Sequence, residues 1–162
     1  MNQISQACLL LGSNIAPEQN IPRAVALLSQ HVEVDLTSSI WETPAVGSSG
    51  PNFLNAAVLV RTDLQPHQLK SQVLHFIENH LGRIRSQDKY APRPIDLDIV
   101  AWDCQVIDPD VWAYAHAAVP VSQVLPCDTH STTGESLSQV ARRLMESTSI
   151  KACGELQPAI LQ

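Results

Sequence analysis

Two aspartates within an aliphatic run are the residues of this 162-residue chain whose types and spacing best suit chemistry. Asp96 and Asp98 alternate with isoleucine and leucine in the segment 93–101. Because successive side chains of a β-strand point to opposite faces, both carboxylates share one face, with Cα atoms roughly 6.5–7 Å apart. Mg²⁺ takes one or two protein carboxylates and completes its shell with water and substrate phosphates. The pattern predicts a metal site for phosphoryl transfer; an amphipathic strand whose acids are neutralised by Arg93 is the alternative.

A basic segment comes directly before these aspartates and suits a phosphate ligand. It contains Arg83, Arg85, Lys89 and Arg93. Planar guanidinium groups hold phosphate oxygens through paired hydrogen bonds, so these cations beside two carboxylates suit a magnesium polyphosphate. The sequence contains no GxxxxGK[ST] motif, so a nucleotide site here would not be a P-loop. The alternative is a loop whose charges are simply solvated.

A second group of residues could recognise a flat ring. Phe53 and Asn55 are two positions apart in a strand-like run, so their side chains project to the same face. An aromatic ring offers a stacking surface, and the neighbouring amide offers a hydrogen-bond donor and an acceptor. The alternative is a core phenylalanine next to a turn asparagine. His116 is one of six histidines and indicates little by itself.

Composition excludes some classes of function. The chain is 44% hydrophobic and 16% charged, as expected of a globular protein in water. A formal net charge of -6 argues against non-specific binding to nucleic acid. No apolar run has membrane-spanning length, and no basic segment precedes a long apolar one. We therefore expect a monomer with one domain, residues 1–162, in the cytoplasm and not on a membrane.

The cysteines are scattered, without a CxxC pair or a histidine at zinc-finger spacing. We expect reduced thiols and no disulfide framework. The four residues are Cys8, Cys104, Cys127 and Cys153.

Hydrophobic periodicity and turn residues predict the elements that must position these side chains. Strands are expected at 7–11, 32–41, 53–62 and from 93 to about 102, and helices at 17–30, 64–81 and 135–147. A tight turn over 103–106 leads to a short return strand, the segment 109–130 is expected to be irregular, and the last dozen residues are weakly patterned. The order β-α-β-β-α-β fits an α+β, ferredoxin-like sandwich with a mainly antiparallel sheet and C-terminal helical additions. Helices then cover one face of the sheet, and the other face is free for a ligand.

Four motifs in this order resemble a known family, 6-hydroxymethyl-7,8-dihydropterin pyrophosphokinase of folate biosynthesis. The resemblance runs from about residue 7 to residue 106 and resumes more weakly at 130–134. The motifs are Gly12-Ser13-Asn14, Phe53-Leu54-Asn55-Ala56-Ala57, Gly82-Arg83-Ile84-Arg85 and Ala91-Pro92-Arg93-Pro94-Ile95-Asp96-Leu97-Asp98.

The resemblance implies transfer of pyrophosphate from ATP to the hydroxymethyl group of the reduced pterin, giving AMP. It implies that Asp96 and Asp98 hold two magnesium ions and that Arg83 and Arg93 grip the phosphates as catalytic residues. Further contacts to ATP, as implied by the resemblance, come from Glu78, Arg85, Ile99 and His116. The pterin-binding residues implied are Thr43, Pro44, Val46, Phe53 (usually tyrosine in the family), Asn55, Tyr90 and Asp96. The implied partners are thus two small molecules, ATP and the reduced hydroxymethylpterin.

The chain also departs from the family pattern. Relatives carry, after the histidine that matches His116, a segment ending in Arg-x-Phe, whose arginine binds ATP and whose phenylalanine stacks on the pterin. Here the segment is deleted, since 116–118 runs directly to 119–121. Tyr90 stands where relatives have tryptophan, and Ala91 replaces glycine. The alternatives are therefore a non-catalytic relative that binds pterin or nucleotide, and a kinase with the same ATP chemistry acting on another alcohol.

Overall fold

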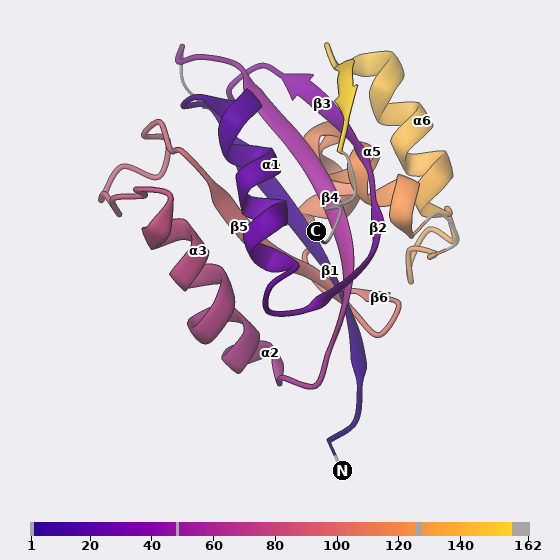
Figure 1. Cartoon of the computed structure of the whole chain (residues 1–162). Helices are drawn as coiled ribbons and strands as arrows, with labels where there is room; N and C mark the ends of the chain where they lie inside the picture. Colours follow the sequence, from indigo (N-terminus) through magenta and orange to yellow (C-terminus); the bar gives the residue numbers. More distant parts are fainter. Residues whose placement is uncertain (1, 48, 126–127, 157–162) are drawn as a thin grey trace.

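One antiparallel sheet organises the molecule, which we describe from a computed structural model covering residues 2–47, 49–125 and 128–156 (Figure 1). The sheet order is β6-β5-β1-β4-β3-β7, and β2 pairs with β4 beside β3. The strands are β1 (Ser5–Ser13), β2 (Glu33–Thr37), β3 (Ser39–Thr43), β4 (Phe53–Thr62), β5 (Asp96–Trp102), β6 (Gln105–Val106) and β7 (Lys151–Glu155). The strands predicted from the sequence thus form the expected ferredoxin-like sandwich with its antiparallel sheet.

The central strands β1 and β4 are buried on both faces, and their side chains divide between two cores. Residues such as Leu9 and Val58 enter the first core, while the alternate residues Cys8 and Ala57 enter the second. This division follows from the period of two along a strand. The continuous apolar sequence of both strands is what a sheet covered on both faces requires.

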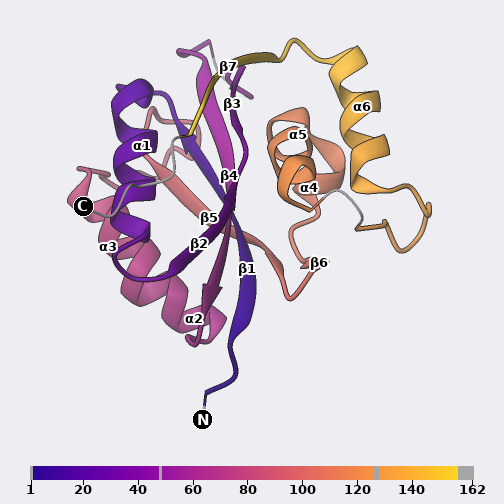
Figure 2. The same ribbon diagram turned by 45° about the vertical axis from the view of Figure 1, so that its right-hand side comes forward.

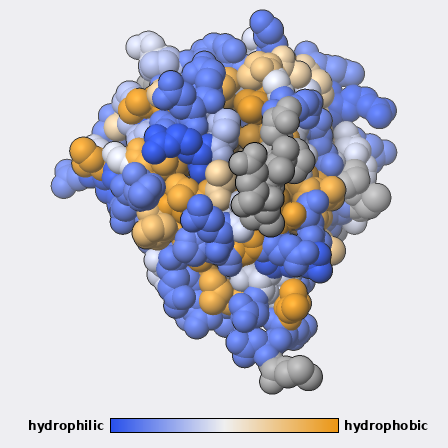
Figure 3. All heavy atoms as spheres, viewed as in Figure 1, coloured by the Kyte–Doolittle hydropathy of each residue, from blue (hydrophilic) through white to orange (hydrophobic). Residues whose placement is uncertain are grey.

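The first core lies under the N-terminal helices. These are α1 (Pro17–Leu28) and a helical run of three segments, α2 (Pro66–Gln68), the π-helical η1 (Leu69–Leu74) and α3 (His75–His80). Their apolar stripes pack on the sheet through Ile21, Leu28 and Leu74, all fully buried. The helices predicted at 17–30 and 64–81 are confirmed, although a continuous α-helix was expected over the second range. On this side the outer surface is mostly polar, with single apolar side chains scattered over it (Figure 3).

The opposite face of the sheet is covered by C-terminal helices, so the sheet lies between two helical layers (Figure 2). They are α4 (Asp110–Ala113), α5 (Ala115–Val124) and α6 (Leu137–Ser147). A capping box at Ser136 and Gln139 starts α6. The expectation that the second face of the sheet is free was therefore wrong for most of the sheet. The part beside the end of β1 and the start of β5 stays uncovered by helices and forms a pocket.

The expectation of an irregular 109–130 segment was also wrong, because α4 and α5 lie within it. Pro120 removes one backbone donor from the interior of α5. Burial outweighs this loss, since seven of the ten residues of α5 are buried and six of these lie in the second core. Periodicity could not reveal such a helix, because an element that is apolar on nearly all sides has no stripe.

Two strand predictions also need correction. The strand expected over 32–41 is divided at Ser38, whose hydroxyl accepts a hydrogen bond from the backbone N–H of Ala57 at 2.7 Å. The weakly patterned C-terminal residues include β7, which pairs with β3. Every residue of β7 is exposed, so no hydrophobic alternation marks it.

The described cysteines are free thiols, as predicted: Cys8, Cys104 and Cys153. Burial raises the pKa of the Cys8 thiol to about 12, so it stays protonated. Cys127 lies outside the described residues. Within the described ranges, none of the helices combines the length and the apolar character that crossing a bilayer demands.

Candidate active site

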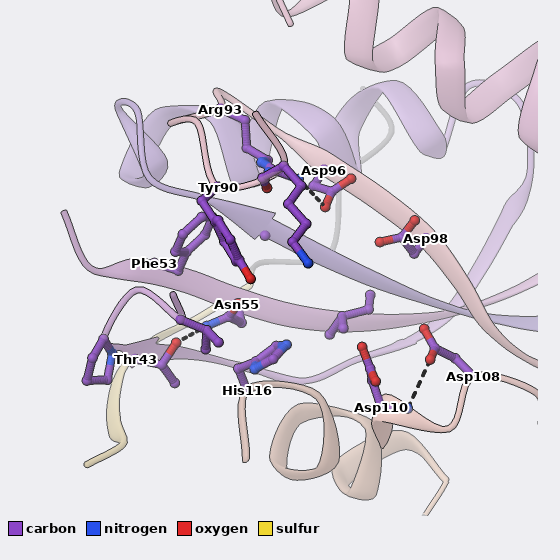
Figure 4. Close-up of a pocket in the computed structure, with 15 residues that line it drawn as sticks. Thr43, Phe53, Asn55, Tyr90, Arg93, Asp96, Asp98, Asp108, Asp110 and His116 are labelled. Carbon is purple, nitrogen blue, oxygen red and sulfur yellow. Dashed lines mark hydrogen bonds and ion pairs between the residues drawn. The ribbon is translucent and has the colours of Figure 1, made fainter. Parts of the chain in front are cut away.

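A pocket of about 310 Å³ opens where β1, β4 and β5 meet the loops at one end of the sheet (Figure 4). It lies on the same sheet face as α5 and contains both acidic and aromatic side chains. Its lining consists of Leu10, Gly12, Thr43, Pro44, Val46, Phe53, Asn55, Lys89, Tyr90, Arg93, Asp96, Asp98, Asp108, Asp110 and His116.

Strand register brings the aspartates of β5 close to Asn55 of β4. Gly12 of β1 pairs with Asp96 of β5 on one side and with Asn55 of β4 on the other. Leu10 pairs with Asp98, so all these residues project to the same face. The prediction that the two aspartates share a face, with the aliphatic residues on the opposite one, is confirmed. A glycine at the centre of this row leaves the space between carboxylate and amide open.

Asp96 is held by two arginines. Its Oδ1 accepts a hydrogen bond from Arg83 Nη1 at 2.7 Å, and its Oδ2 accepts one from Arg93 Nη1 at 3.2 Å. The neutralisation by Arg93 that the sequence left open as an alternative therefore occurs. A carboxylate paired in this way is fixed in position, and the two arginines present further donors for a phosphate.

Asp98 differs from Asp96 because its carboxylate forms no hydrogen bond or ion pair within the described ranges. Burial raises the pKa of its carboxyl to about 6, and the charge of Asp96 adds to this effect. Such a group gains from a nearby cation, which would favour its charged form.

The donor set around the two aspartates fits magnesium. Among the described residues, no three His, Cys, Asp or Glu side chains gather as a metal-binding group. Two carboxylates facing an open pocket are nevertheless what Mg²⁺ uses when substrate phosphates supply its other oxygens. Asp96 and Asp98 thus match the small number of protein ligands that Mg²⁺ usually takes.

A buried glutamate lies behind the arginines. Glu78 of α3 is 2% exposed and forms ion pairs with Arg83 and, at 3.6 Å, with Arg85. Arg83 therefore connects α3 to Asp96 of β5. The side chain of Arg85 is 62% exposed and has room to move, whereas that of Arg83 is 14% exposed.

The amide of Asn55 is oriented by its neighbours. Its Nδ2 donates to Thr43 Oγ1 at 2.9 Å and to the carbonyl oxygen of Trp41 at 3.3 Å. With both donors directed into the protein, Oδ1 is left as an acceptor on the side of Gly12 and the pocket. Phe53 lies beside it and gives this end of the pocket an aromatic surface (Figure 4).

His116 enters the pocket from the first turn of α5. Its ring stacks on that of Tyr114, with centroids 5.6 Å apart and planes at 28°. Burial lowers the pKa of His116, although the charges of Asp110 and Asp108 oppose this shift. At neutral pH the imidazole is uncharged and offers a hydrogen bond.

The structure separates the predicted site residues into two groups. Those that line the pocket are Thr43, Pro44, Val46, Phe53, Asn55, Tyr90, Arg93, Asp96, Asp98 and His116. Those outside its lining are Glu78, Arg83, Arg85 and Ile99. Arg83 still reaches the pocket through Asp96, and Ile99 lines a second, more open pocket that shares Asp98.

Sequence reasoning missed two acidic pocket residues, Asp108 and Asp110, and two basic residues, His67 of α2 and Lys70 of η1, that line the second pocket. Asp108 lies just before α4 and Asp110 is its first residue. This helix was not expected. The signal that could have found them is the Asp-Pro-Asp sequence, which is typical of a helix start.

Comparison with known proteins agrees with the family resemblance of the sequence motifs. The family model for 7,8-dihydro-6-hydroxymethylpterin-pyrophosphokinase (HPPK) matches residues 8–126. A 2-amino-4-hydroxy-6-hydroxymethyldihydropteridine pyrophosphokinase of Bacillus subtilis is 42% identical over 120 residues, covering 72% of this chain and 70% of the relative. The enzyme of that name from Methylorubrum extorquens is 35% identical over 135 residues, covering 76% and 84%.

Solved structures support the fold. Wild-type Plasmodium falciparum HPPK-DHPS with pterin and p-hydroxybenzoate superposes with a TM-score of 0.71 at 12% identity, covering 91% of this chain. This chain spans only 45% of that structure's chain. The family model covers well over half of the chain, and the two relatives are at least 35% identical with at least 70% of their own length covered. The chain therefore belongs to the 7,8-dihydro-6-hydroxymethylpterin-pyrophosphokinase family.

Proposed function

We propose that this chain transfers pyrophosphate from ATP to the hydroxymethyl group of 6-hydroxymethyl-7,8-dihydropterin, giving AMP and the pterin pyrophosphate. Membership of its family makes it an ATP-dependent pyrophosphokinase of folate biosynthesis. One observation carries the assignment to this site: a single pocket combines Asp96, Asp98 and Arg93 with the aromatic and amide surface of Phe53 and Asn55.

The acceptor end of the pocket suits a flat, polar heterocycle. Phe53 offers a ring for stacking, and Asn55 Oδ1 offers an acceptor for an N–H of the pterin. Thr43 fixes the amide through its hydroxyl, while Pro44 and Val46 form the adjoining wall. The amide is fixed before the ligand arrives, which reduces the entropy lost on binding.

The phosphate end is organised by cations. Arg83 and Arg93 lie on the two oxygens of Asp96, and Lys89 lines the pocket beside them. Phosphoryl transfer needs alignment and charge neutralisation more than covalent help from the protein. The exposed guanidinium of Arg85 and the neutral imidazole of His116 are free to add contacts to ATP, and Ile99 lines the neighbouring hollow.

Asp96 and Asp98 would hold the magnesium ions, for which we propose a count of two. When bound, the ions supply neutralisation of the phosphate charge and alignment of donor and acceptor oxygens. Asp98, with no partner in the described ranges and a raised pKa, is the ligand that gains most from them.

The direct test is AMP formation from ATP, Mg²⁺ and the reduced hydroxymethylpterin, with the pterin pyrophosphate measured in parallel by chromatography. Equal amounts of the two products are expected. Calorimetric binding of both ligands without AMP would instead favour a non-catalytic relative. AMP formation only with another alcohol in a substrate panel would identify a related kinase. A single domain, a monomeric state and a cytoplasmic location stay predictions.

A further inference from the structure

A glycine lies against one of the aromatic rings that line the pocket. Gly47, in the loop between β3 and β4, lies against the ring of Tyr90, in the loop before β5. A Cβ added to Gly47 would lie 2.4 Å from Cε1, 2.7 Å from Cζ and 2.9 Å from Cδ1 of that ring. Contacts this short do not occur between real side chains, so the ring fills the space that any side chain at position 47 would need.

The backbone of Tyr90 is already fixed by its own loop. Its N–H donates to Asp88 Oδ1 at 2.9 Å, and the Arg93 guanidinium donates to the carbonyl of the preceding residue, Lys89. At the base of the loop the backbone N–H of Arg93 donates to Asn14 Oδ1 at 2.7 Å. With the backbone held, the position of the ring depends on its contact with Gly47 and on Lys89 Nζ, which lies 4.9 Å from the ring centroid.

The contact lies at the acceptor end of the pocket. Tyr90 and Phe53 appear side by side there, above Asn55 and Thr43 and away from Asp98 (Figure 4). Both rings line the same cavity. Displacing the Tyr90 ring would therefore act first on the end proposed for the pterin.

We infer that Gly47 is a positioning residue: the absence of a side chain there lets the Tyr90 ring take its place in the pocket wall and brings the two loops into contact beside the acceptor. The identity of that acceptor rests on the proposed function; the contact itself does not. A methyl group at position 47 must displace the ring, because the three atoms it meets, Cδ1, Cε1 and Cζ, belong to one rigid edge of that ring.

A matched pair of variants separates this contact from backbone strain. Gly47 has φ +76° and Gly134 has φ +73°, but a Cβ at Gly134 would meet nothing within 4 Å. Gly47→Ala and Gly134→Ala thus carry similar left-handed strain, and only the first displaces a ring. Thermal unfolding of both variants, followed by circular dichroism, verifies that each is folded at the assay temperature.

The position of the loop is read without any ligand by the rate of tryptic cleavage after Lys89. Displacing the ring by overpacking should raise this rate about fivefold or more in Gly47→Ala and leave it unchanged in Gly134→Ala. Tyr90→Ala should raise the rate similarly, and Gly47→Ala should add nothing in that background. Equal rates in the two alanine variants, or an undiminished Gly47→Ala effect without the Tyr90 ring, would overturn the inference.

Steady-state kinetics give the second readout. Gly47→Ala should raise the KM for the reduced hydroxymethylpterin about fivefold while the KM for ATP changes by less than about twofold. A rise of the same size for both substrates would contradict positioning at the acceptor end. If the wild-type chain forms no AMP, the proposed function fails, and the proteolysis experiment still decides whether Gly47 positions Tyr90.

Discussion

At the scale of single residues, the two aspartates of β5 have different surroundings and therefore different roles. Both oxygens of Asp96 are occupied by arginines, whereas Asp98 has no partner within the described ranges. Alternation along the strand was enough to predict that they share a face. The contact from Arg93, three residues before Asp96, was left open as an alternative by the sequence. The contact from Arg83 could not be predicted, because it depends on how the loop between α3 and β5 folds back.

Replacing Asp98 should damage catalysis and spare the fold. Asp98→Asn removes a proposed metal ligand but no contact that forms within the described ranges, so kcat should fall by about a hundredfold or more with little change in Tm. AMP formation and thermal unfolding measure the two effects. Asp63→Asn, at an exposed turn, is the control. Retained AMP production by Asp98→Asn would rule out the metal role.

The aromatic ring of Phe53 should matter for the pterin alone. Phe53→Ala is expected to weaken pterin binding about tenfold or more, the size of one lost stacking contact, and to leave ATP binding nearly intact. Titration calorimetry with each ligand makes the comparison. Phe76→Ala, on the exposed side of α3, should change neither affinity. Equal losses for both ligands would show that Phe53 is a packing residue.

Acidification should weaken the fold through His116, whose pKa is lowered by burial from the ordinary value of 6.5. The folded state then binds fewer protons than the unfolded state, so stability is complete above the unfolded pKa and is lost as the pH falls toward the folded one. The free energy of unfolding in urea should decrease more between about pH 7.5 and pH 5 in wild type than in His116→Gln. Equal decreases would contradict an uncharged, desolvated imidazole.

At the scale of elements, three consecutive segments of the chain meet at Arg83. The end of α3 supplies Glu78, the following loop supplies Arg83, and the start of β5 supplies Asp96. The sequence predicted the helix, the basic loop and the strand, because each has a clear pattern or a stop signal. It did not predict α5 or β7: the first is buried on nearly all sides and the second is exposed throughout.

Glu78→Gln should reveal the connection that Arg83 makes between α3 and β5. It removes the charge that faces Arg83 in a buried position, and losing one partner of a buried ion pair costs about 3 kcal/mol of unfolding free energy. The kcat/KM for ATP should also fall, because Arg83 loses the group that orients it. Urea unfolding and steady-state kinetics test both expectations. Glu135→Gln, in an exposed ion pair with Arg143, should change stability by less than about 1 kcal/mol. An equally small effect of Glu78→Gln would contradict the connection.

At the scale of the whole molecule, one sheet separates two hydrophobic cores and shares its central strands between them. The α+β order and the antiparallel sheet followed from the sequence, since periodicity and turns defined most elements. The sequence did not predict that helices cover the second face of the sheet, because this covering depends on long-range packing of C-terminal segments. The pocket exists where this covering stops, which explains why its acidic wall at Asp108 and Asp110 was missed.

Shared strands should make the two cores unfold together. Trp102 packs against the first core, and Trp41 and Trp112 pack against the second. Urea unfolding of Trp102→Phe, which reports only on the second core, should give the same midpoint by tryptophan fluorescence and by far-ultraviolet circular dichroism. Two separate transitions would contradict a single domain over residues 1–162.

Both terminal phosphates of ATP should move together onto the acceptor at this pocket. ATP labelled with ³²P at the β-phosphate follows this transfer in the presence of Mg²⁺ and reduced hydroxymethylpterin. Pyrophosphoryl transfer predicts that the label appears in the pterin product and that AMP is unlabelled. Label found in ADP, or retained in ATP although both substrates bind, would contradict pyrophosphoryl transfer at this pocket.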